Sequence, residues 1–121
     1  MTKDMALYAF YSGFGLPAYD ENTVPDEAEL PYIAYQVATS DFDNNVMLSA
    51  SLWYRSTSWA EIQDKADEIN DYIGRGGVFL PFDGGAIWLR RGSPFSQRMD
   101  EPSDNAVRRI LLNLTAEYVC N

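Results

Sequence analysis

The fold follows from Val46-Met-Leu-Ser-Ala-Ser-Leu-Trp-Tyr-Arg55 and, two residues later, from Ser58-Trp-Ala-Glu-Ile-Gln-Asp-Lys-Ala-Asp-Glu-Ile-Asn-Asp-Tyr-Ile73. In the first stretch apolar side chains recur at every second position, which predicts a strand with one buried face. In the second stretch Ser58 and Glu61 have the spacing of a capping box, which predicts the start of a helix. The apolar stripe of this helix comprises Trp59, Ile62, Ala66, Ile69 and Ile73. A sheet with this helix laid on one face is the simplest arrangement.

The N-terminal part of the chain predicts one more helix and one more strand. Apolar residues at helical spacing predict a short helix from Asp4 to about Gly13. The proline-rich and acidic stretch Leu16–Pro31 predicts an extended surface connection. Tyr32–Val37 alternates as a strand, and we expect it to form an antiparallel hairpin with 46–55 across the polar loop Thr39–Asn45.

The C-terminal half of the chain predicts three further strands. Gly74, Gly76 and Gly77 are expected to end the long helix. The strands are expected at Val78–Leu80, Ala86–Arg91 and Val107–Val119, with a turn at Pro81–Gly85 and a long polar loop at Gly92–Asn105. Together these elements predict an α+β fold, a single mostly antiparallel sheet packed against two helices. The length of 121 residues fits one domain spanning residues 1–121.

The composition argues against an enzyme. The chain has no histidine, the commonest general base and metal ligand, and its single cysteine, Cys120, has no second thiol. Carboxylate pairs such as Asp41 with Asp43, and Asp100 with Glu101, lie in predicted polar loops where solvation keeps them ionised. We therefore expect no catalytic residue, no metal site and no cofactor.

The charge and hydropathy patterns limit the possible partners. Eighteen acidic against nine basic side chains give a net charge of −9, which opposes tight binding to the phosphates of nucleic acid. No apolar run approaches the ~20 residues of a membrane-spanning helix, and the first residues do not form a secretion signal. We expect synthesis in a cytoplasm and no membrane partner.

The basic residues are concentrated in the last third of the chain. Five of the nine lie between positions 90 and 109, whereas the first half is heavily acidic. This segregation suits head-to-tail contact between identical subunits, although surface scatter with local ion pairs explains it equally well. Arg90 and Arg91 are adjacent on a predicted strand and should therefore point to opposite faces. The residues predicted to make subunit or tail contacts are Asp41, Asp43, Asn44, Asn45, Arg90, Arg91, Arg98, Asp100, Glu101, Arg108 and Arg109.

Several sequence blocks, taken in order, resemble those of tail terminator proteins of long-tailed bacteriophages (siphophages), which are often described as minor capsid or head-tail joining proteins. The blocks are Gly15-Leu-Pro-Ala-Tyr19, Leu30-Pro-Tyr32, Leu52-Trp-Tyr-Arg-Ser-Thr-Ser-Trp59, Ile73-Gly-Arg-Gly-Gly77, Asp83-Gly-Gly-Ala-Ile-Trp-Leu-Arg-Arg-Gly-Ser-Pro-Phe95 and Pro102-Ser-Asp-Asn105. They extend over nearly the whole chain.

The resemblance implies a tail-terminator-like α+β subunit that assembles as a homo-hexameric ring. Such a ring caps the tail tube, ends tail polymerisation and joins the tail to the head. Its implied partners are other copies of itself, the tail tube protein and a head-completion or connector protein. DNA would pass through the ring without sequence-specific binding, and the protein would be part of the virion after assembly in the host cytoplasm.

Two other interpretations remain open at this stage. One is a different station in the virion, such as another neck, head-completion or minor capsid protein. The other is a small acidic regulatory module that binds one host protein through a sheet edge or its acidic helix. The second alternative predicts a one-to-one complex and no self-assembly.

Overall fold

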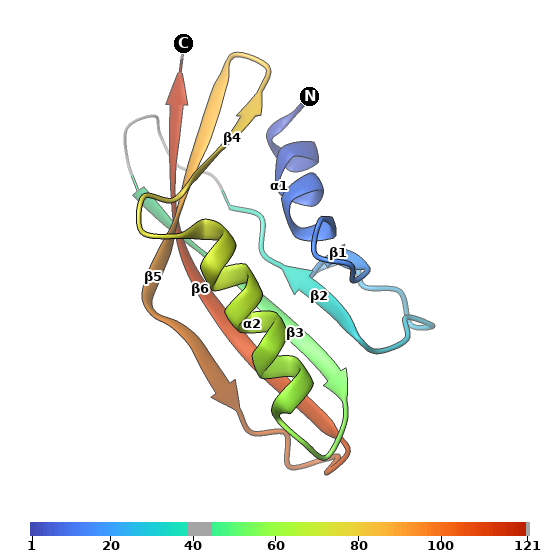
Figure 1. Ribbon diagram of the computed structural model, residues 1–121. Helices are drawn as coiled ribbons and strands as arrows, with labels where there is room; N and C mark the ends of the chain where they lie inside the picture. The colour runs from blue at the N-terminus through green and yellow to red at the C-terminus, as the bar shows by residue number, and fades with distance from the viewer. Residues whose placement is uncertain (39–44, 121) are drawn as a thin grey trace.

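Two helices lie on the same face of a six-stranded sheet in the computed structural model, which describes residues 1–38 and 45–120 (Figure 1). The helices are α1 (Lys3–Ser12) and α2 (Ala60–Ile73). The strands are β1 (Ala18–Asp20), β2 (Tyr32–Tyr35), β3 (Asn45–Arg55), β4 (Val78–Phe82), β5 (Gly85–Met99) and β6 (Val107–Cys120). The predicted α+β class and the two predicted helices are confirmed.

The strand order across the sheet is β1-β2-β3-β6-β5-β4. The two long strands β3 and β6 form its centre, in antiparallel register from Asn45 opposite Glu117 to Arg55 opposite Val107. The predicted antiparallel pairing of β2 with β3 is confirmed. The sheet is mixed, however, because β1 pairs with β2 in parallel. A sheet built only from hairpins would contain no such pair.

The core lies between the helices and one face of the sheet. On β3 the predicted alternation is confirmed, since Leu48, Ala50, Leu52 and Tyr54 are buried on the side of the helices. The same face of β6 contributes Ile110, Leu112, Leu114, Ala116 and Tyr118, all fully buried. The two centre strands thus place their apolar sets opposite each other, and the helices exclude water from both sets.

Helix α2 covers the centre of the sheet with the predicted stripe, because Ile62, Ala66, Ile69 and Ile73 are buried. The predicted capping box is wrong. Helix α2 begins at Ala60 with Trp59 as N-cap, and no side chain caps it. Ser58 lies one residue too early for that position, and its Oγ instead accepts a hydrogen bond from the amide of Ala60 at 3.1 Å.

Helix α1 begins at a side-chain cap, because the Thr2 hydroxyl accepts a hydrogen bond from the amide of Met5 at 3.2 Å. Its buried face includes Leu7, Phe10 and Tyr11, and the Tyr11 ring stacks on Tyr35 of β2 at 4.8 Å between centroids. The helix therefore packs beside β1 and β2, and its N-terminal end also reaches β4, where the Met1 carbonyl oxygen accepts a hydrogen bond from the Asp83 amide at 2.7 Å. It agrees with the predicted helix to within a residue at each end.

Three predicted connections are corrected by the structure. The stretch 16–31 contains strand β1, which is short and pairs with β2. The expected loop 92–105 is strand as far as Met99, because the long β6 provides a partner for residues 96–99 beyond a register shift. The turn predicted at 81–85 contains fewer residues than expected, because Pro81 and Phe82 belong to strand β4. Since β4 is an edge strand, it tolerates a proline that has no backbone N–H.

Two buried tyrosines differ in whether their hydroxyl groups have partners. The Tyr118 hydroxyl donates a hydrogen bond to the Ala38 carbonyl oxygen at 2.7 Å, whereas the Tyr11 hydroxyl is buried without a hydrogen-bond partner among the described residues. Burial raises the pKa of Tyr11, so its hydroxyl is neutral.

Tyr118→Phe should therefore lower the free energy of unfolding by about 1 kcal/mol, and Tyr11→Phe should raise it by a similar amount. Urea unfolding measures both, and equal losses in the two variants would contradict the assignment.

Candidate assembly surfaces

The face of the sheet opposite the helices carries aromatic and basic side chains. We call it the open face, because neither helix covers it (Figure 1). Its members are Met47 and Trp53 of β3, Phe79 of β4, Trp88 and Arg90 of β5, and Arg109, Leu111 and Glu117 of β6. Phe79 and Met47 are 61% and 64% exposed, which is unusual for side chains of this size on a sheet.

The arginines of the open face lie over tryptophan rings. The Arg90 guanidinium is 4.2 Å from the centroid of Trp88, and that of Arg109 is 5.0 Å from the centroid of Trp53. The Trp88 ring also stacks on Phe79 at 5.6 Å between centroids. Arginine paired with tryptophan provides both apolar area and charge, a combination enriched at protein interfaces. The open face therefore has the composition of a contact surface.

The predicted division of Arg90 and Arg91 between the two faces is confirmed. Arg90 lies on the open face, 3.8 Å from the Glu117 carboxylate, and it also donates to the Asn45 side chain. Arg91 lies on the helix side and donates to Asn70 Oδ1 of α2 at 2.9 Å. For Arg90, the alternative explanation of the basic cluster therefore applies, because this arginine forms a local ion pair with an acidic residue.

Two further predicted contact residues surround Trp59 at the start of α2. The guanidinium groups of Arg98 and Arg108 lie 5.0 and 5.3 Å from its ring centroid. Arg108 also donates to the carbonyl oxygen of Thr57 at 2.8 Å, so it ties β6 to the segment that enters α2. The five clustered arginines of the sequence therefore form no single patch, because strand alternation divides them between two faces.

The remaining members of the predicted contact set are acidic residues and asparagines. Asp100 is exposed directly after β5, and Glu101 is half-buried beside it. Asn45 is the first residue of β3. Asp41, Asp43 and Asn44 lie outside the described residues.

A cleft lined by three arginine residues lies between the C-terminal end of α2 and β5. We call it the arginine cleft; it measures about 510 Å³ and is lined by Asn70, Arg75, Arg90, Arg91, Gly92 and Phe95. Sequence reasoning missed Arg75, because Gly74–Gly77 predicts only a helix end. That prediction is confirmed, since the Gly74 amide donates to the Asn70 carbonyl oxygen.

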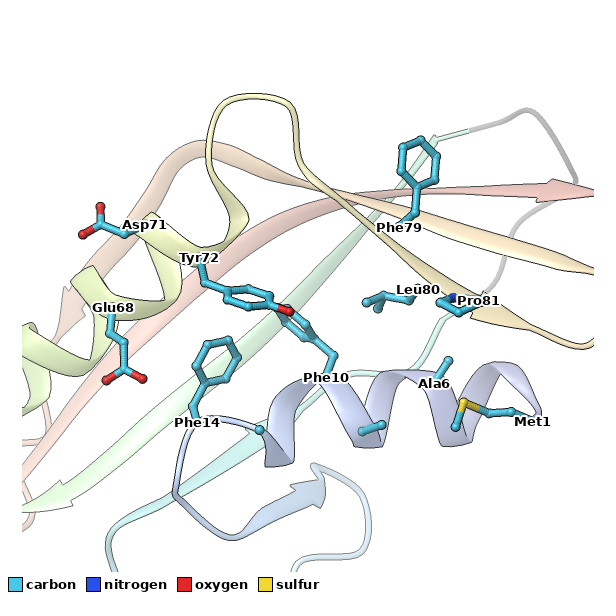
Figure 2. Close-up of a pocket in the computed structure, with 12 residues that line it drawn as sticks. Met1, Ala6, Phe10, Phe14, Glu68, Asp71, Tyr72, Phe79, Leu80 and Pro81 are labelled. Carbon is cyan, nitrogen blue, oxygen red and sulfur yellow. The ribbon is translucent and has the colours of Figure 1, made fainter.

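An apolar groove of about 730 Å³ runs between α1 and α2 above β4 (Figure 2). Rings from all three elements line it, among them Phe10 of α1, Tyr72 of α2 and Phe79 of β4. Glu68 and Asp71 stand at the α2 wall of the groove, and Glu68 is paired with Lys65 at 3.0 Å. The groove forms only when two helices distant in sequence pack side by side, so no local pattern predicts it.

Groups that could hold a metal ion are absent from the described residues: no three or more acidic, histidine or cysteine side chains gather there. Within the same part of the chain, no helix has the length and apolar character needed to cross a membrane.

The architecture is that of an α+β protein with two helices on one face of a mixed sheet. No protein-family model matches the chain, and no curated protein matches it significantly. Among solved structures, a chain of the "Virion of native gene transfer agent (GTA) particle" has the same fold, with a TM-score of 0.54 and 18% sequence identity. The match covers 95% of this chain and 90% of that chain.

Proposed function

We propose that this chain is a structural protein of a phage-like virion. The observation that carries the proposal is the shared fold with a chain of a gene transfer agent virion, which extends over 95% of the chain. Within the virion, the tail-terminator-like sequence blocks support a ring that caps the tail tube, ends its growth and joins the tail to the head. The role requires adhesion between proteins and no catalysis.

The distribution of side chains supports this role physically. The protein carries an apolar groove between the two helices, an arginine cleft at the end of α2 and an open face with aromatic rings. The groove meets the open face at Phe79, and the cleft meets it at Arg90. A subunit of a ring needs at least two separate contact surfaces for its neighbours and further surfaces for the tube below and the connector above. A net charge of −9 also suits a channel through which DNA slides without being held.

Omission of the protein during particle assembly tests the proposed function. Without a terminator the tube subunits continue to polymerise, so we expect overlong tails that lack heads. Electron microscopy of particles from a deletion strain measures tail length, and the gene supplied in trans should restore uniform, joined tails.

Tails of normal length in that deletion strain would place the protein at another neck, head-completion or minor capsid station. Absence of the protein from purified particles, together with a one-to-one complex with a host protein, would favour the regulatory module instead. Either result contradicts the terminator proposal.

A further inference from the structure

The arginine cleft gathers positive charge in a strongly acidic protein. None of the residues that line it is acidic. Among the described residues, Arg75 is exposed and forms no ion pair, and the Arg91 side chain forms a hydrogen bond only with the neutral Asn70. Arg90 differs, because its guanidinium lies on the open face and is already paired with the Glu117 carboxylate at 3.8 Å. The uncompensated positive charge of the cleft therefore belongs to Arg75 and Arg91.

The guanidinium groups of Arg75 and Arg91 have no acidic partner among the described residues, and an anion bound beside them would offset their charge. Each is a planar donor whose geometry matches the two oxygens of a carboxylate or a phosphate. The chemistry of the cleft thus defines its ligand as a group with such oxygens.

The same chain offers a matching acidic surface. Residues 20–29, which begin at the last residue of β1, include Glu21, Asp26, Glu27 and Glu29, and all four are exposed. No described residue forms an ion pair with any of these four carboxylates. We call this stretch the acidic segment.

The cleft and the acidic segment lie at opposite ends of the sheet. The cleft borders β5, one strand from the β4 edge, whereas the acidic segment follows β1 at the other edge (Figure 1). Contact between the cleft of one copy and the acidic segment of another is therefore head-to-tail. In such a pair one copy still has a free acidic segment, and the other still has a free cleft. Such a contact repeats from copy to copy and produces a ring when the rotation closes.

We propose that the arginine cleft binds the acidic segment 20–29 of a second copy of this chain. This contact rests on the proposed ring and specifies how neighbouring subunits adhere. Arg75 and Arg91 receive the carboxylates of Glu27 or Glu29, and Asn70 holds Arg91 in place for them. Because these charges are partly solvated, the contact weakens as ionic strength rises.

Carbodiimide cross-linking tests the contact directly. Arg75→Lys keeps the charge in the cleft and introduces an amine that can form an amide bond with a carboxylate. We expect a cross-link between position 75 and Glu27 or Glu29, identified by mass spectrometry. In an equimolar mixture of isotopically light and heavy protein, half of these links should join a light and a heavy chain. Links within one chain only, or links to acids elsewhere, would overturn the proposal.

Charge reversal tests whether the contact stabilises assembly. Arg75→Glu should reduce cross-linked oligomers about tenfold or more relative to the wild-type protein. Chemical cross-linking of the two proteins, both without the Arg75→Lys change, measures this at high protein concentration and in particles. Combining Arg75→Glu with Glu27→Arg and Glu29→Arg should restore the oligomers, because both partners are then reversed. Arg55→Glu, which also removes an exposed ion pair with Asp104, and Asp64→Lys make the same changes of charge at exposed sites elsewhere and should leave assembly unchanged.

Two outcomes would contradict the proposed contact and leave the proposed virion role unaffected. One is normal assembly of the Arg75→Glu variant, or a loss that the combined variant does not restore. The other is a phosphate site: Arg75→Glu would then weaken binding of double-stranded DNA in fluorescence anisotropy and leave oligomers intact. Absence of the wild-type protein from particles would instead contradict the proposed function itself.

Discussion

Leu112→Ala is expected to lower the free energy of unfolding by about 2–5 kcal/mol. Leu112 is fully buried on β6, opposite Ala50 of β3 and Ser96 of β5, and its side chain points to the helices. The strands on both sides are held by their own ladders, so the surrounding side chains cannot move in to fill the space. The variant therefore loses the transfer free energy of the removed groups and also retains a cavity.

The adjacent Leu111 provides a matched control. It lies on the same strand but on the open face, where it is only half-buried. Leu111→Ala should cost less than about 1 kcal/mol, because part of its surface is already in contact with water. Urea unfolding followed by circular dichroism measures both variants, and equal losses would mean that the open face is buried as deeply as the core.

Gly77→Ala is expected to destabilise the protein by about 3 kcal/mol through two additive causes. Gly77 has a φ of 77°, a conformation that disfavours any side chain. An added Cβ would also lie 2.5 Å from the Leu89 carbonyl oxygen and 2.8 Å from Arg90 Cγ. The first of these atoms belongs to the backbone of β5, which is fixed in its ladders with β4 and β6. The strand must therefore shift to admit the methyl group.

The neighbouring Gly76 provides a control that distinguishes a specific steric clash at Gly77 from a general effect of replacing glycine by alanine. Apart from its two chain neighbours, no described residue has an atom within 4 Å of a Cβ added there, and Gly76 does not have a positive φ. Gly76→Ala should change stability by no more than about 0.5 kcal/mol. Thermal and chemical unfolding of the pair measure the difference, and similar effects at both positions would argue against close packing of the α2–β4 turn on β5.

The two faces of the sheet have different tasks in this fold. The helix side buries the apolar sets of β3 and β6 and stabilises the subunit. The open face and the arginine cleft contribute little to that core, so charge reversal at Arg75 should alter assembly while leaving folding intact. Variants of Leu112 and Gly77 should instead reduce both folding stability and assembly. This contrast distinguishes a defect in the subunit contact from a defect in folding.

The sequence by itself determined the elements whose side chains repeat with a regular period. Alternation on β3 and β6 and the stripe on α2 predict strands, helix and core faces correctly, because the period of a strand or a helix assigns each residue to a side. The opposite directions of Arg90 and Arg91 follow from the same rule. These are local properties, encoded within ten to fifteen consecutive residues.

Only the tertiary structure decided which segments meet. Strand β1 exists because β2 offers it a parallel partner, and β5 extends to Met99 because β6 is long enough to pair with it. The arginine cleft joins Arg75 to Arg90 and Arg91, and the apolar groove joins α1 to α2. Such contacts depend on the relative placement of elements distant in the chain. Their free energy arises from surfaces buried between those elements, which no local pattern of residues records.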